Sequence, residues 1–146
     1  MGFGSFYSYQ GGQVSEVPCE VSDYVFGRMS RRLQTHIVAL QVAEFSEVWW
    51  FYPSTDAAEN DSYVAYNYAQ GTWQTGTLSR TTGIDRGVFY FPLMAGADRT
   101  MYSHEVGQVP AGFPVYAETG PIALGTGDTT FTARRVHPDE ATQGGV

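Results

Sequence analysis

Hydrophobic and polar residues alternate over short stretches along most of the chain, and Gly or Pro interrupts the alternation at short intervals. A period of two is typical of β-strands, whose successive side chains point to opposite faces. Residues 4–21 are predicted to form a β-hairpin with its turn at Gln10-Gly11-Gly12, because glycine permits the positive φ of a tight hairpin. Pro18 places the returning strand at an edge or a bulge.

A helical period replaces the alternation in one segment, residues 22–33. Ser22 is a suitable N-cap, and Asp23 lies in the first turn, where the helix dipole favours an anion. The core-facing positions recur at helical spacing, and they are Val25, Phe26, Met29 and Leu33. We expect one short helix over residues 22–33 and no other of note.

The central segment, residues 36–80, has the pattern of four strands joined by short connections. These strands are expected at residues 36–45, 47–52, 62–68 and 72–78. They would form an up-and-down meander of roughly the length of one propeller blade. Further strands are expected within residues 87–136, at residues 87–93, 100–106, 113–118 and 129–136.

Aromatic residues are concentrated in this central segment. Trp49 and Trp50 are neighbours on one predicted strand, so they point to opposite faces. A sheet with large aromatics on both faces is buried on both faces, as stacked blades are. The predicted structural core consists of Trp49, Trp50, Phe51, Tyr66, Tyr68 and Trp73.

Three segments share the pattern x-Tyr-small polar-aromatic-x-x-Gly, at residues 6–12, 65–71 and 101–107. In a strand with this pattern, the two aromatic residues would pack on one face, the small polar residue between them would be exposed, and the glycine would allow the chain to turn. Repeated units of this kind are typical of blade architectures. Hairpin-rich β-proteins of other kinds also place Tyr-x-Tyr before Gly, so that alternative stays open.

The predicted fold is therefore all-β, made of antiparallel meander blades of β-propeller type with one short helix. A closed propeller needs at least about four blades, whereas 146 residues supply only about three of about 40–50 residues each. We accordingly expect residues 1–146 to be a single β-rich domain or a fragment, and the propeller to be incomplete.

The charge balance bears on possible partners. The net charge is −7, and all eight basic residues are Arg. A domain that grips DNA phosphates is usually basic, so tight nucleic-acid binding is disfavoured, although an acidic surface can line a passage for DNA. No apolar run is long enough to span a bilayer, and no signal peptide is visible.

Candidate chemistry is sparse. Cys19 is the only cysteine, which excludes an intrachain disulfide and a Cys-based zinc site. Glu59-Asn60-Asp61 could supply oxygen ligands for Ca²⁺, but the interpretation as a solvated turn is preferred. Gly125-Thr126-Gly127-Asp128 lacks the Lys-Ser/Thr pair of a phosphate loop.

Catalysis has a similarly weak basis in the sequence. A glycosidase needs two carboxylates that face each other, and the candidates are Glu44, Glu47, Glu105 and Glu118. No Gly-x-Ser-x-Gly elbow is present. We predict no catalytic residues, no cofactor, no metal site and no enzymatic activity.

One stretch resembles a family of bacteriophage virion proteins. The most specific part is residues 47–54, Glu-Val-Trp-Trp-Phe-Tyr-Pro-Ser, followed by residues 59–68, Glu-Asn-Asp-Ser-Tyr-Val-Ala-Tyr-Asn-Tyr, then by Trp73, Gly76-Thr77-Leu78 and Arg80-Thr81. The flanks agree at residues 18–26, 118–122 and 125–128. The family belongs to short-tailed phages, whose propeller-bearing nozzle proteins close the lower end of the tail tube.

This resemblance implies a structural subunit of a phage tail, located in the virion. It implies a homo-oligomeric ring, with sixfold symmetry expected, which contacts other tail proteins and through which DNA passes without sequence-specific binding. The family supplies no catalytic residues, and its members are longer than this chain. A carbohydrate- or receptor-binding module of a virion, which would expose its Trp and Tyr, is the alternative, and a propeller-type glycan hydrolase is a third hypothesis.

Overall fold

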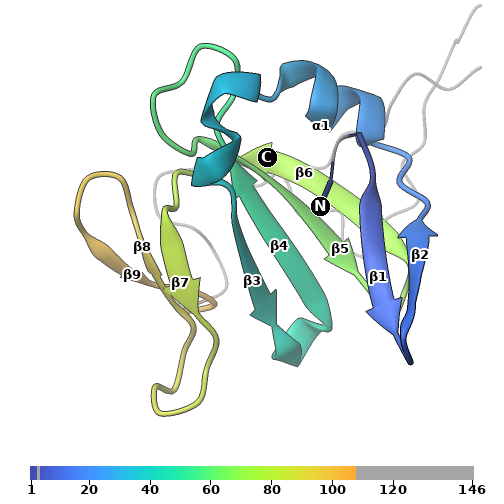
Figure 1. Cartoon of the computed structure of the whole chain (residues 1–146). Helices are drawn as coiled ribbons and strands as arrows, with labels where there is room; N and C mark the ends of the chain where they lie inside the picture. The colour runs from blue at the N-terminus through green and yellow to red at the C-terminus, as the bar shows by residue number, and fades with distance from the viewer. Residues whose placement is uncertain (3, 108–146) are drawn as a thin grey trace, which may run out of the picture. The chain divides into compact units, whose positions relative to one another are not determined.

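The structure, a computed structural model, describes residues 1–2 and 4–107. The chain divides into two compact units, Met1–Gln108 and Val109–Val146, and the described residues belong to the first. This unit is mostly β, as predicted, and contains antiparallel sheets of two, four and three strands (Figure 1). The strands predicted at residues 113–118 and 129–136 lie outside the described residues.

The first sheet is the hairpin expected within residues 4–21. Strand β1 (Phe6–Gln10) pairs with β2 (Gln13–Val17). Gly11 and Gly12 connect them with φ of 58° and 85°, the left-handed conformation that suits a two-residue turn. Phe6 is the one buried residue of β1, so the hairpin contributes a single aromatic anchor to the core.

The helix prediction for residues 22–33 is wrong in its second half. Helix α1 (Ser22–Arg28) ends when Met29 turns to an extended conformation and pairs with Ser54. The Ser30 N–H then donates to the Pro53 carbonyl oxygen at 2.9 Å. The rest of the segment is the 3₁₀ helix η1 (Arg31–His36), and Ser22 is the first helical residue and not the N-cap.

The central sheet is a four-stranded antiparallel meander. Its strands follow the order β3 (Val38–Val42), β4 (Glu47–Tyr52), β5 (Ser62–Asn67) and β6 (Thr72–Thr77). The 3₁₀ helix η2 (Ala43–Phe45) lies between β3 and β4, so the strand expected over residues 36–45 is shorter at both ends.

The third sheet contains β7 (Thr82–Ile84), β8 (Leu93–Ala95) and β9 (Met101–Ser103). The strand predicted over residues 87–93 is wrong, because residues 87–92 form bends and the strand begins at Leu93. A turn at residues 97–98 lies in the connection from β8 to β9. Strand β7 was not predicted, and it lies against β3.

Each face of the central sheet has its own core. On one face, Tyr52 and Val64 pack with Phe6 and the α1 residue Val25. On the other face, Leu40, Val42 and Phe51 pack with Met94 of β8. The three sheets within residues 1–107 form no closed ring, so the described part establishes an antiparallel, mostly β fold without establishing a propeller.

Candidate functional site

Three of the predicted core residues meet on the face covered by the hairpin. Phe6 lies at the centre of this aromatic cluster, 5.0 Å from the Trp50 ring and 4.5 Å from the Trp73 ring. Tyr66 is paired with Trp73 across the strands and lies 4.5 Å from it. The Trp73 indole N–H donates to the Pro18 carbonyl oxygen at 2.8 Å, which ties β6 to the end of the hairpin.

The other three predicted core residues are divided between the opposite face and the surface. Trp49 stacks on Tyr63 at 4.5 Å, and Phe51 is buried with Met94. The Trp49 indole N–H donates to Glu47 at 2.8 Å. Tyr68 lies beyond β5 and is 48% exposed, so the structure does not place it in either core. Both tryptophans of β4 are half-buried.

The repeated Tyr-containing pattern has one feature common to all three copies. The glycine that ends each copy has positive φ, namely 85° at Gly12, 71° at Gly71 and 86° at Gly107. The aromatic positions do not share an environment, since Tyr7 and Tyr9 are exposed and Tyr66 is half-buried. The pattern therefore marks chain reversal and does not mark a common packing unit.

The loop considered for calcium has a different role. Asn60 is buried, and its side-chain amide donates to the carbonyl oxygens of His36 at 2.8 Å and Arg80 at 3.1 Å. Asp61 accepts hydrogen bonds from the Ser54 N–H and hydroxyl, at 2.8 Å and 2.6 Å. These residues join three separate connections, so the interpretation of this loop as a solvated turn is wrong for Asn60. No metal-binding group of three or more acidic, His or Cys side chains is present in residues 1–2 and 4–107.

A polar cluster at Arg80 joins the central sheet to the third sheet. The Arg80 Nε–H donates to His104 Nε2 at 2.9 Å, and its guanidinium lies 4.1 Å from the centre of the Tyr102 ring. The Tyr102 hydroxyl donates to Asp98 at 2.6 Å. Burial lowers the pKa of His104, the positive charge of Arg80 lowers it in the same direction, and together they bring it to about 4. His104 is therefore a neutral acceptor at pH 7.

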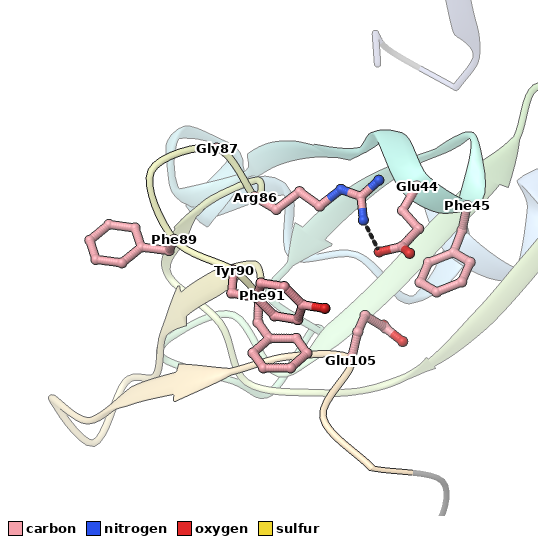
Figure 2. A pocket seen from close by; sticks show the side chains of 8 residues that line it. All are labelled: Glu44, Phe45, Arg86, Gly87, Phe89, Tyr90, Phe91 and Glu105. Carbon is pink, nitrogen blue, oxygen red and sulfur yellow. Dashed lines mark ion pairs between the residues drawn. The ribbon is translucent and has the colours of Figure 1, made fainter.

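A hollow with a volume of about 530 Å³ lies beside η2, the segment that follows β3 (Figure 2). Acidic, basic and aromatic side chains share it, and we call it the acidic hollow. Arg86 forms an ion pair with Glu44 at 2.7 Å. The Tyr90 and Phe91 rings meet edge to face at 4.8 Å. Its lining residues are Glu44, Phe45, Arg86, Gly87, Phe89, Tyr90, Phe91 and Glu105.

Negative charge exceeds positive charge around this hollow. Glu44 and Glu105 line it, and Glu47 lies close enough to act on Glu105 electrostatically. Burial raises the pKa of Glu105, and the charges of Glu47 and Glu44 raise it further. Arg86 balances one carboxylate, so the site has room and charge for an added cation.

The acidic hollow was not predicted as a site from the sequence. Glu44, Glu47 and Glu105 were considered as isolated carboxylates, and the aromatic run at residues 89–91 was assigned to a strand. Pro92 was the available signal, because a proline lacks the N–H that a strand donates and so argues against a strand that continues through it. The pairing of η2 with the bend at Arg86 is a tertiary contact that no local pattern reveals.

The comparisons with known proteins identify no relative. No family model, no curated protein and no solved structure matches the chain. Among the described residues, no helix has the length and apolar character to cross a membrane.

Proposed function

We propose that this chain is a structural subunit of a phage tail, in a ring around the DNA exit channel at the lower end of a short tail. The observation that carries the proposal is the central meander, with tryptophans on both faces, one face covered by the hairpin and α1 and the other by the third sheet. Consecutive antiparallel strands that are covered on both faces are typical of blades packed between neighbouring blades.

Unpaired strand edges support an assembled state. Strand β6 is the last strand of the central sheet among the described residues, and only β5 pairs with it. Edge strands present unpaired N–H and C=O groups that recruit other chains. The net charge of −7 agrees with a passage that repels DNA phosphates, since like charges prevent DNA from adhering.

Immunogold labelling of virions tests the tail location. An antibody against this chain should label the lower end of the tail of the phage that encodes it. The purified chain should form rings in negative-stain images. If purified virions do not contain this chain, or if the antibody signal is confined to non-virion fractions, the structural role is excluded.

A carbohydrate- or receptor-binding module is the second candidate. The acidic hollow favours it, because aromatic rings next to carboxylates can bind a sugar by stacking and hydrogen bonding. The tryptophans argue against it, since all three are half-buried in the two cores and none forms an exposed platform. Titration with glycans would decide: saturable binding lost in Tyr90→Ala, but retained in Tyr9→Ala, would support this candidate.

A further inference from the structure

The acidic hollow and the most concentrated exposed basic group of the described chain lie at opposite ends of one strand. Arg31 and Arg32 are adjacent, exposed residues of η1, immediately before β3, and we call them the arginine pair. Glu44 lies in η2, immediately after β3 (Figure 1). The five residues of β3, about 17 Å long at the usual rise of a strand, lie between η1 and η2.

The arginine pair has no ion-pair partner among residues 1–2 and 4–107. Three other arginines are engaged, since Arg86 is paired with Glu44, Arg80 bonds His104, and Arg28 lies 4.9 Å from the Tyr24 ring centre. Both arginines are exposed, so each side chain can reach a partner. At the acidic hollow, Arg86 offsets one of the two lining carboxylates, so one carboxylate is in excess and is opposite in charge to the arginine pair.

The chemistry of the hollow suits a guanidinium better than a neutral ligand. A guanidinium can stack on an aromatic face and bond a carboxylate in the same plane. Tyr90, which is 85% exposed, supplies such a ring, and Glu105 supplies a carboxylate that forms no ion pair with the described residues. Phe45 adds a second exposed ring at the edge of the hollow.

We propose that the acidic hollow of one copy of this chain binds the arginine pair of a second copy. The two surfaces differ and lie at opposite ends of β3, so the contact is head-to-tail. Such a contact produces a ring when the rotation between copies closes and a filament when it does not. This inference rests on the proposed function, because it names the contact between neighbouring subunits of the ring.

A charge-exchange experiment on the full chain tests the contact. Variant one is Arg31→Glu with Arg32→Glu, and variant two is Glu44→Gln with Glu105→Arg. Each variant alone places like charges opposite each other, so its dissociation constant should rise about 100-fold or more. An equimolar mixture restores opposite charges at every contact and should associate again, as light scattering measures.

Glu20→Arg and Arg99→Glu are the controls, because both reverse exposed charges at residues that line neither the acidic hollow nor the hollow beside the arginine pair. They should associate like the wild type, and circular dichroism should show that all variants are folded. Wild-type association that neither variant weakens, or a mixture that stays dissociated, would overturn the contact and leave the tail proposal standing. If purified virions do not contain this chain, the tail proposal is refuted, whatever the charge-exchange experiment shows.

Discussion

Asn60 is the residue on which the connections between strands depend most directly. Its amide donates to two backbone carbonyls from different connections, and its own Oδ1 is buried with no partner in the described chain. A buried acceptor that loses its donor costs roughly 1–3 kcal/mol. This single side chain therefore holds together η1, the loop of residues 54–61 and the segment after β6 that contains Arg80.

Asn60→Ala should lower the free energy of unfolding by about 2–3 kcal/mol, since it leaves the carbonyls of His36 and Arg80 without their donor. Denaturant titration measures the change. Asn67→Asp is the control, because it removes an amide that donates to the Phe45 carbonyl where water can substitute, and it keeps the side-chain oxygen that accepts from the N–H groups of Ala69 and Gln70. Its cost should stay below about 1 kcal/mol. Equal losses in both variants would contradict the role assigned to Asn60.

His104 gives the fold a dependence on pH. Its pKa is about 4 in the folded state and about 6.5 in an unfolded chain. Between these values the unfolded chain binds a proton that the folded chain does not. Stability is therefore complete above about pH 6.5 and falls as the pH is lowered to about 4.

His104→Gln should remove this pH dependence, because an amide oxygen can accept from Arg80 at every pH. With allowance for partial exposure, the wild type should lose about 1–2 kcal/mol across the window, seen as a falling melting temperature from pH 7 to pH 4. Asp61 contributes losses at lower pH, since burial raises its pKa but the hydrogen bonds from Ser54 and Ser62 outweigh burial and lower the pKa below the ordinary range of an aspartate. Parallel pH profiles for the wild type and His104→Gln would show that His104 is not responsible.

Within the strands and helices, two glycines differ in the space that an added side chain would find. Gly76 of β6 faces Tyr63 of β5, and an added Cβ would lie 2.6 Å from the tyrosine ring. That ring also stacks on Trp49, so it cannot move without disturbing the core of this face. Gly27, near the end of α1, has open space around the same position.

Gly76→Ala should destabilise the protein by about 1–3 kcal/mol through overpacking. Gly27→Ala should stabilise it by up to about 1 kcal/mol, because alanine is the better helix former. Thermal melting of the two variants compares the same chemical change in two environments. A stabilising Gly76→Ala would mean that the Tyr63 ring does not cover β6 as described.

Elements with a strong local pattern were predictable, and elements decided by tertiary contacts were not. The alternation around Trp49 and Trp50, and the glycines of the hairpin, located the central sheet and β1–β2 because both signals are local. The end of α1 was missed because Met29 leaves the helix to pair with Ser54, a partner 25 positions away. Strand β7 has only three residues and exists through its contact with β3 and β8.

The candidate site was predictable only in its separate parts. The aromatic residues 89–91 and the carboxylates were visible in the sequence. Their proximity depends on the ion pair between Arg86, which lies in a bend, and Glu44, which lies in η2 and is far from Arg86 in the sequence. Asn60 was treated as an ordinary turn residue, because its type is common in turns and burial cannot be seen in one sequence.

For the whole molecule, the proposed head-to-tail contact links stability to concentration. A partner that binds only the folded chain stabilises it, by about 2.7 kcal/mol when its concentration is 100 times the dissociation constant. The melting temperature should therefore rise by several degrees between dilute and concentrated samples. Added salt should reduce this rise, because the contact consists of exposed charges that salt screens. Calorimetry at two protein concentrations and two salt concentrations measures both effects, and an invariant melting temperature would indicate a self-sufficient monomer.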